Sequence, residues 1–350
     1  MNMKDFVTKL CEKAIDLGSS DIHVIPEDEN YGIYYRHINK IEKNYTLTEA
    51  EGRRLIAYFK YLGNMDVGER RRPQSGASPL TIYDLPFNAR YSTMTTFQAQ
   101  ESLVIRLLSQ VNQLDLEKQT FFKSEYHRIK SLVNYQSGLI LFAGPVSSGK
   151  TTTMYHALTQ QVDQYKKQVI SIEDPVEIEE DRFLQFQVNE TAGVTYDSLV
   201  KQSLRHHPDI MIIGEIRDEE TAKAAIRAAL TGHLILASVH AKNAEGVVDR
   251  LLELGVAETL LAQTVIGVIF QKMLPKYCPF CKGICHMNCN HFKTVEKKAI
   301  LYDVRGPEEI QALLNKQTNP RHDFNHWLDK AYAYGFINAD VYKQYVIPNI

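Results

Sequence analysis

The sequence predicts a two-domain α/β protein in which a small α+β domain precedes a larger domain built on a parallel sheet. Its 350 residues are more than a single hydrophobic core usually organises. Short alternating strand-like runs and amphipathic helices fill the first third of the chain, whereas continuous apolar runs alternate with helical sequence after Gly138. We expect a domain at 1–108, a linker at 109–119, a second domain at 120–276 and a last segment at 277–350.

The first domain is expected to combine two helices with several short strands. Apolar residues recur at helical intervals over residues 1–18, and the same periodicity returns at Ala50–Leu62. Apolar and polar residues alternate as in half-buried strands in four further segments, which are 22–24, 32–38, Phe87–Met94 and Ser102–Leu108.

The second domain is expected to follow the polar linker and to open with a helix at about 120–134. Four apolar runs are predicted to be strands, namely Leu139–Ala143, Val169–Ile172, Asp209–Ile213 and Leu234–Ser238. Because each run is followed by helical sequence, they indicate a parallel sheet covered on both faces. The tail from about residue 296 is predicted to be helical.

Composition and charge exclude several classes of protein. Lys and Arg number 40 and Asp and Glu number 42, and this balance argues against a general nucleic-acid coat. No signal-peptide core and no apolar stretch of membrane-spanning length is present, so we expect a cytoplasmic protein without a transmembrane segment. Four of the five cysteines lie between Cys278 and Cys289, which in a reducing compartment suggests a metal site more than disulfides.

A phosphate-binding loop is the most specific motif of the sequence. Gly144–Thr151 match G-x-x-x-x-G-K-[ST] in full, after an apolar strand and before a helical segment. Lys150 is expected to reach the β- and γ-phosphates of ATP, and the Thr151 hydroxyl to bind Mg²⁺. The expected contacts to ATP are Gly144, Ser147, Ser148, Gly149, Lys150, Thr151 and Thr152. A chance Gly/Ser-rich turn is the alternative, and the flanking strand and helix argue against it.

Two strands are predicted to end in acidic residues at the carboxyl edge of the sheet. Glu215 follows Ile210–Gly214 and is expected to polarise the attacking water, although Gly214 stands where an aspartate often precedes this glutamate. Glu173 and Glu177 follow another strand and are expected to supply further acidity, with Glu177 a candidate Mg²⁺ ligand. The alternative is that these acids cap helices or pair with arginines such as Arg217 and Arg182.

Two histidines, His233 and His240, flank the strand Leu234–Ser238. A histidine near a sheet edge is more often structural than catalytic, but a strand bracketed by two histidines could place one of them beside the γ-phosphate. His240 is the candidate catalytic residue.

The order of these motifs resembles the secretion-ATPase superfamily, which contains the motors of type II secretion and type IV pili. The matching segments are Gly144–Thr151, Glu173–Glu177, Pro208–Asp218 and Thr231–His240, together with Ser20–Pro26, Tyr35–Asn39 and Met65–Gly76 in the first domain. The resemblance implies a RecA-like motor domain with a PAS-like domain before it, a helical C-terminal segment, and a homo-hexameric ring with ATP bound between subunits. It also implies that Arg90 and Arg106 reach the nucleotide of a neighbouring subunit; the alternative for both is a salt bridge on a sheet surface.

Three departures from the family pattern are expected, and two of them lie within the matching region. His206 and His207 stand where the family commonly has other polar residues, so no role is assigned to them. The family's four-cysteine zinc element has a longer spacer than this chain, in which the second pair follows the first directly. The candidate Zn²⁺ ligands are Cys278, Cys281, Cys285 and Cys289, and unliganded reduced thiols are the alternative.

The resemblance therefore implies an ATP-hydrolysing motor at the cytoplasmic face of the cell membrane. Without the long N-terminal extension of many larger members, the chain is most similar to motors of competence-type pseudopili for DNA uptake. The implied partners are a polytopic membrane platform protein and, indirectly, pilin-like subunits, with no direct nucleic-acid contact. Two alternatives remain, a pilus-retraction ATPase and a nucleotide-gated regulatory protein with negligible turnover.

Overall fold

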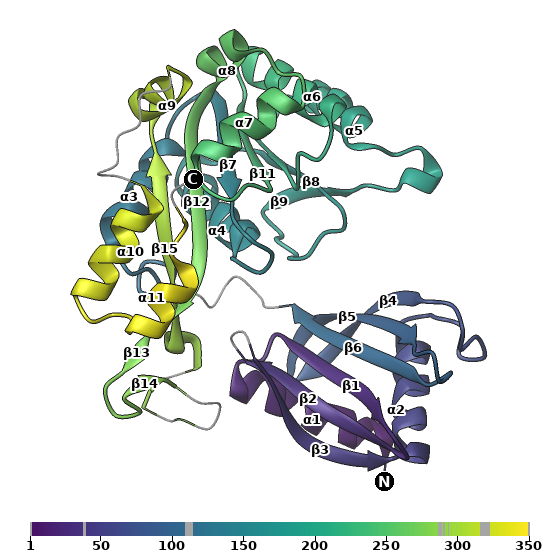
Figure 1. Ribbon diagram of the computed structural model, residues 1–350. Helices are drawn as coiled ribbons and strands as arrows, with labels where there is room; N and C mark the ends of the chain where they lie inside the picture. Colours follow the sequence, from purple (N-terminus) through teal and green to yellow (C-terminus); the bar gives the residue numbers. More distant parts are fainter. Residues whose placement is uncertain are drawn as a thin grey trace. The chain divides into compact units, whose positions relative to one another are not determined.

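The computed structural model describes residues 2–37, 40–108, 115–285, 289, 291–292, 294–315 and 323–348 (Figure 1). The chain divides into two compact units, the first made of Met1–Gln110 with His286–Val295 and the second of Val111–Cys285 with Glu296–Ile350. Of the expected linker 109–119, residues 109–114 lie outside the described residues.

The first unit is a six-stranded sheet with two helices. Its elements are α1 (Met3–Leu17), β1 (Asp21–Glu27), β2 (Asn30–His37), β3 (Lys40–Thr48), α2 (Glu49–Leu62), β4 (Gln74–Ile82), β5 (Leu85–Thr95) and β6 (Glu101–Leu108). The strand order is β3-β2-β1-β6-β5-β4, and all neighbours are antiparallel. Helix α2 begins in a capping box, in which the side chains of Thr48 and Glu51 each accept a hydrogen bond from the other residue's backbone N–H.

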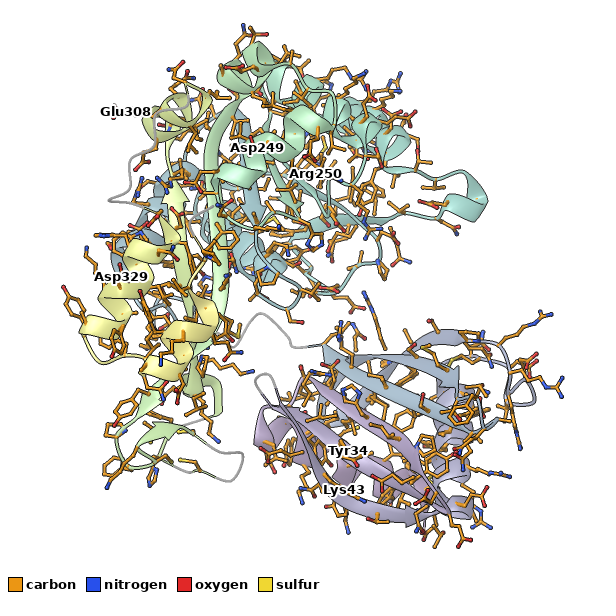
Figure 2. All side chains as sticks on the ribbon, in the orientation of Figure 1. Tyr34, Lys43, Asp249, Arg250, Glu308 and Asp329 are labelled. Carbon is orange, nitrogen blue, oxygen red and sulfur yellow. The ribbon has the colours of Figure 1, made fainter. Side chains whose placement is uncertain are left out.

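The two faces of this sheet differ in polarity. Ile22 and Tyr35 lie on the face that packs against α1 and α2. Because side chains alternate along a strand, their sequence neighbours point to the other face. There Tyr34 and Lys43, both labelled in Figure 2, contact the carboxylate of Glu27. This second face thus carries charged and hydrogen-bonded side chains, in contrast to the apolar face.

The second unit is built on a seven-stranded sheet. Its strands are β7 (Gly138–Ala143), β8 (Val169–Glu173), β9 (Phe183–Gln187), β10 (Ile210–Ile213), β11 (Leu234–Val239), β12 (Val265–Pro275) and β15 (Lys298–Arg305). They lie in the order β15-β12-β7-β11-β10-β8-β9, and all neighbours are parallel except β15, which is antiparallel to β12. The short pair β13 (Tyr277–Cys278) and β14 (Gly283–Ile284) lies between β12 and β15 in the sequence.

Helices cover both faces of this sheet, as the continuous apolar strands predict. They are α3 (Lys123–Leu132), α4 (Lys150–Tyr165), α5 (Tyr196–Ser203), α6 (Glu219–Leu230), α7 (Glu245–Glu253), α8 (Glu258–Thr264), α9 (Pro307–Leu314), α10 (Phe324–Ala333) and α11 (Ala339–Tyr345). Ile140 and Phe142 of β7 share a core with α3 and α4, whereas Leu139 and Leu141 share one with α6 and α7. Alternate residues of one strand thus belong to opposite cores.

The tail is not helical throughout, so the expectation for residues after 296 needs correction. Lys298–Arg305 form strand β15, which adds an antiparallel edge to the sheet, and helices follow only from Pro307 onward. The sequence did not reveal this strand because it ends in a buried ion pair, in which Arg305 Nε donates to Asp303 Oδ1 at 2.8 Å. Both residues are almost fully buried, and their charges hide the apolar pattern of the strand in the sequence.

Within the described part of the chain, no helix combines the length and apolar character needed to cross a bilayer.

Candidate functional site

The phosphate-loop motif lies between β7 and α4, as the sequence predicts. Strand β7 is buried along its whole length, and α4 begins at Lys150 with Gly149 before it. Gly144 and Gly149 have φ angles of 147° and 87°, which residues with a side chain rarely adopt. At Gly144 a Cβ atom would also lie 2.2 Å from the Gln271 carbonyl oxygen. The two glycines therefore allow the tight turn and its close contact with β12.

The side chain of Lys150 folds back over its own loop. Its Nζ donates to the carbonyl oxygen of Gly144 at 2.8 Å and to that of Pro145 at 3.3 Å. Burial lowers the pKa of Lys150, while the carboxylates of Glu215 and Glu177 act in the opposite direction. The ammonium group is thus next to the loop and within the electrostatic influence of both acids.

Parallel pairing brings the predicted acidic residues to one edge of the sheet. Ile213 of β10 pairs in register with Ile172 of β8 on one side and with Ala237 of β11 on the other. All three strands end there, so the residues that follow them share the carboxyl edge. We call Glu173, Glu177 and Glu215, with the neighbouring Asp174, the carboxylate edge.

Glu215 holds two partners at this edge. Its Oε2 accepts a hydrogen bond from Arg217 Nε at 2.6 Å, and its Oε1 lies 3.1 Å from His240 Nε2. Arg217 also lies 3.4 Å from Asp174 Oδ2 through Nη1. The glutamate side chain is 17% exposed, whereas His240 and Arg217 are about half exposed, at 52% and 54%. Glu215 is therefore oriented by its neighbours and still reached by solvent.

Glu173 is in a different setting, because it is 4% exposed and contacts α4. Its carboxylate accepts a hydrogen bond from the Tyr155 hydroxyl, which in turn accepts one from Gln185 Nε2 at 2.8 Å. Burial raises the pKa of Glu173, against the opposing effect of these hydrogen bonds. The acid at this position links β8 to the helix that follows the phosphate loop.

Gly214 is enclosed by the neighbouring strand. A Cβ atom there would lie 3.0 Å from the Tyr196 hydroxyl, 3.1 Å from the Ile172 carbonyl oxygen and 3.2 Å from Glu173 Cα. Two of these atoms belong to the backbone of β8. A side chain at position 214 would require these neighbours to shift by a few tenths of an ångström, which disfavours an aspartate before Glu215.

The two candidate histidines lie at opposite ends of β11. His240 follows the carboxyl end of the strand and meets Glu215. His233 precedes the strand, where its Nδ1 lies 3.1 Å from the Thr231 hydroxyl oxygen. Only His240 of this pair is near the carboxylate edge. His206 packs its ring against Phe186, with centroids 6.4 Å apart, and His207 ends a short 3₁₀ turn.

Arginines form a row across the polar face of the first unit's sheet. Asp21 of β1 pairs in register with Arg106 of β6, which pairs with Arg90 of β5. Arg106 Nε donates to Asp21 Oδ1 at 2.7 Å, and Arg36 Nε lies 3.8 Å from Asp21 Oδ2. Asp21 is 2% exposed, but the side chains of Arg36 and Arg106 are 40% and 45% exposed. We call Arg36, Arg90 and Arg106, together with Asp21, the arginine row.

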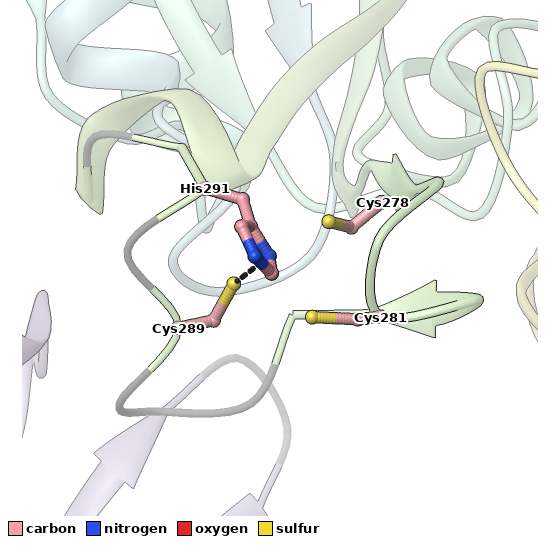
Figure 3. A group of neighbouring side chains, drawn as sticks. All are labelled: Cys278, Cys281, Cys289 and His291. Carbon is pink, nitrogen blue, oxygen red and sulfur yellow. Dashed lines mark hydrogen bonds between the residues drawn. The ribbon is translucent and has the colours of Figure 1, made fainter.

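The cysteine segment brings four potential ligands together (Figure 3). The ligand atoms of Cys278, Cys281, Cys289 and His291 all lie within 4.8 Å of one another, and all five cysteines are thiols. In a tetrahedral zinc site with Zn–S distances of about 2.3 Å, the sulfurs are about 3.8 Å apart, so the set fits such an ion. His291, which is not among the ligands expected from the sequence, takes the place expected for Cys285, which is buried and outside this set.

Several residues at the site were not identified from the sequence. Tyr155 and Gln185 hold Glu173, and Gln271 contacts the phosphate loop from β12. All three belong to regular helices or strands and match no short motif. Their only sequence signal is a polar residue within an otherwise apolar segment, which does not identify the partner.

Comparisons with known proteins identify the family of this chain. A family model described as Type II/IV secretion system protein matches residues 2–321. Competence protein ComGA of Bacillus subtilis (strain 168) is 36% identical over 343 residues, which cover 96% of this chain and 96% of that protein. ComGA of Streptococcus pneumoniae is 41% identical over 272 residues, covering 78% and 85%. Type II secretion system ATPase E of Vibrio cholerae is 32% identical over 277 residues, covering 79% and 55%.

Two solved structures share the fold over almost the whole chain. The Legionella pneumophila ATPase DotB has a TM-score of 0.75 at 18% identity and covers 97% of this chain and 94% of its own. The pilus retraction motor PilT with bound ADP has a TM-score of 0.70 at 21% identity, covering 98% and 97%. At such identities the likeness concerns the fold alone. It confirms the predicted α/β architecture with a small domain before the larger one.

Proposed function

The chain belongs to the Type II/IV secretion system protein family, and from that premise we propose that it is an ATPase that powers assembly of a competence-type pilus for DNA uptake. The observation that carries the proposal is the position of Lys150, beside the phosphate loop and under the influence of Glu215 and Glu177. A loop that holds phosphates next to a carboxylate that orients water is the minimal equipment for hydrolysis. The cargo is inferred from the ComGA relatives.

In this proposal the loop binds ATP through its backbone N–H groups, with Ser147, Ser148, Gly149 and Thr152 around Lys150. Lys150 exchanges its two carbonyl partners for the β- and γ-phosphate oxygens. Mg²⁺, held by the Thr151 hydroxyl with Glu177 as a further ligand, would neutralise phosphate charge. The hydroxyl and the carboxylate are hard oxygen ligands of the type that this ion prefers.

Glu215 is the proposed general base for the attacking water. His240 and Arg217 hold its two oxygens, which fixes the direction of the remaining lone pairs. His240 thereby acts through Glu215 or beside the γ-phosphate. Glu173 is proposed to contribute by fixing α4 through Tyr155, since its carboxylate is buried against that helix.

Arg90 and Arg106 are proposed to act on ATP held by another subunit of a homo-hexamer. Guanidinium groups stabilise the charge that develops on a transferring phosphoryl group. Their side-by-side register and the exposure of Arg106 support this role, and the hydrogen bond to Asp21 orients the Arg106 guanidinium. The ring would work at the cytoplasmic face of the membrane on a polytopic platform protein, which feeds pilin-like subunits into the fibre.

A structural Zn²⁺ is proposed for Cys278, Cys281, Cys289 and His291. Metal analysis of the purified protein should find about one zinc per chain, and Cys278→Ser should lose it. His291→Ala should lose zinc as well, whereas Cys285→Ser should keep it. If His291→Ala keeps zinc and Cys285→Ser loses it, the four-cysteine site expected from the sequence is correct instead.

Two other functions compete with assembly. PilT, which shares the fold, is a retraction motor. A strain lacking this gene should then carry surplus fibres, whereas an assembly motor predicts that fibres and DNA uptake are both lost. A nucleotide-gated regulator would bind ATP without hydrolysing it.

The direct test is ATP binding and hydrolysis by the purified full-length chain with Mg²⁺. We expect the wild-type protein to bind ATP and release phosphate, and Lys150→Ala to lose both while it melts at a similar temperature. Binding without phosphate release, even with the membrane partner added, would favour the regulator. Absence of ATP binding by folded protein would refute the proposal.

A further inference from the structure

Two neighbouring side chains of the β12–β15 ribbon reach the phosphate loop and the helix after it. Gln271 of β12 and Tyr302 of β15 are register partners in this antiparallel pair. Gln271 Nε2 donates to the Ser148 carbonyl oxygen at 2.7 Å, and the Tyr302 hydroxyl lies 3.1 Å from Thr153 Oγ1. All four residues are 2% exposed or less. The ribbon therefore makes one buried polar contact on each side of Lys150.

The contact to Ser148 fixes the orientation of a peptide group in the loop. In a planar trans peptide the C=O and the following N–H point in opposite directions. A Ser148 carbonyl held by Gln271 therefore turns the Gly149 N–H away from β12. Such N–H groups are the phosphate ligands of a loop of this type, so the Gln271 hydrogen bond determines where one of them points.

The backbone of β12 also supports the beginning of the loop. The carbonyl oxygen of Gln271 would be 2.2 Å from a Cβ atom at Gly144, so the two backbones are in close contact. One residue of β12 thus meets the loop at Gly144 through its main chain and at Ser148 through its side chain. The loop is held at both ends by the same position of the ribbon.

Packing alone does not explain an amide at position 271. Gln271 Oε1 is buried and has no hydrogen-bond partner among the described residues. A buried, unpaired oxygen costs free energy that a methionine of similar shape would avoid. The useful part of this side chain is therefore its Nε2 donor, which among the described residues donates to the phosphate loop.

We propose that Gln271 and Tyr302 are positioning residues that hold Ser148–Thr153 in the shape that binds nucleotide. Neither side chain needs to touch ATP; each acts through the backbone or hydroxyl that it holds. This inference rests on the proposed ATPase function and assigns to the β12–β15 ribbon a part in nucleotide affinity.

The first test replaces the donor and keeps the shape. Gln271→Met should weaken ATP binding by about fivefold to tenfold, the effect of one buried hydrogen bond, and raise KM by the same factor while kcat changes less than twofold. The control is Gln161→Met, which removes another buried amide donor, to Asn134, near the far end of α4. It should lower the melting temperature without changing ATP affinity.

The second test removes only a hydroxyl. Tyr302→Phe keeps the ring that stacks on Tyr126, with centroids 6.4 Å apart, and should weaken ATP binding by about threefold to fivefold. Tyr35→Phe is its control, because this buried hydroxyl in the first unit donates to the Leu10 carbonyl oxygen at 3.1 Å. This pair remains informative where Gln271→Met fails to fold.

A third variant gives a signature that a purely structural role would not produce. Gln271→Glu can donate to the Ser148 carbonyl only when protonated, so its ATP affinity relative to wild type should improve as the pH falls from 8 to 6. Wild-type protein that binds ATP, together with Gln271→Met and Tyr302→Phe proteins that bind it equally well, would overturn the inference. Wild-type protein that binds no ATP would instead refute the proposed function.

Discussion

The arginine row and the carboxylate edge are opposite in charge and are assembled by different means. The row contains one acid, Asp21, and the edge is contacted by one arginine, Arg217, which donates a hydrogen bond to Glu215. The edge follows from strand direction, because parallel strands end on the same side whatever their order. The row follows from register in an antiparallel sheet, where a shift of one residue would send each side chain to the other face. Apolar runs that alternate with helical sequence indicate parallel strands, whereas no local sequence pattern indicates the register of an antiparallel sheet.

If the arginine row and the carboxylate edge serve one reaction, loss of the Glu215 carboxylate should lower the turnover rate most. Glu215→Gln should lower kcat by about 10³-fold, the usual contribution of a general base, while ATP still binds. Phosphate release and equilibrium binding measure the two quantities. Glu220→Gln, on the exposed first turn of α6, is the matched control and should keep normal turnover. Normal turnover by Glu215→Gln would remove the edge from the chemistry.

Loss of an arginine from the row should come next. Arg106→Ala should lower kcat by about 10²-fold with little change in ATP affinity, since the guanidinium stabilises charge in the transition state. Arg53→Ala, which removes an exposed arginine paired with Glu49 on α2, should have no such effect.

Mixing variants sharpens this prediction. If the row serves the nucleotide of another subunit, a mixture of Arg106→Ala and Glu215→Gln chains contains some sites with both groups intact. Activity should then exceed that of either variant alone. No gain on mixing, after subunit exchange has been verified, would mean that the row and the edge do not act across subunits.

A smaller effect is expected from the acid that organises the row. Asp21→Asn removes the charge that holds Arg106 and Arg36 and should lower kcat by about tenfold. In the Arg106→Ala background the same change should cost little more, because both variants remove one interaction. Additive losses would show that Asp21 acts independently of Arg106.

The smallest effect is expected for Glu173, the buried acid of the carboxylate edge, and it concerns the free energy of unfolding. Burial raises the pKa of Glu173 above its ordinary value of 4.5, so the group binds a proton more readily in the folded state than in the unfolded state. The stability that this group contributes is complete below pH 4.5 and is lost as the pH rises through the folded-state pKa. Glu173→Gln stays neutral, so its free energy of unfolding relative to wild type should rise with pH over that window. Urea denaturation at several pH values measures it; parallel curves would contradict the assignment.

Much of the second unit could be predicted from the sequence. Its central strands are buried throughout and mostly apolar, and Gly144–Thr151 specify a turn that few other residues can form. Glu215 and His240 could be assigned to one edge because each follows a recognisable buried strand, and parallel strands end on the same side of a sheet. Strand β15 could not, because Asp303 and Arg305 neutralise each other only in the folded chain.

The remaining contacts depend on pairing that no local pattern encodes. Arg36 joins Asp21 and Arg106 only through the register of β2, β1 and β6. Gln271 reaches Ser148 only because β12 lies beside β7. The resemblance to a family suggested Arg90 and Arg106, but not the acid that holds one of them.

The two bonds from Lys150 to the carbonyl oxygens of Gly144 and Pro145 have a kinetic consequence. A loop that satisfies its own cation stays folded while no nucleotide is bound. After products leave, return of the Lys150 side chain to these two carbonyl oxygens restores the arrangement described here. We therefore expect recovery of the empty site to be fast compared with the other steps of turnover.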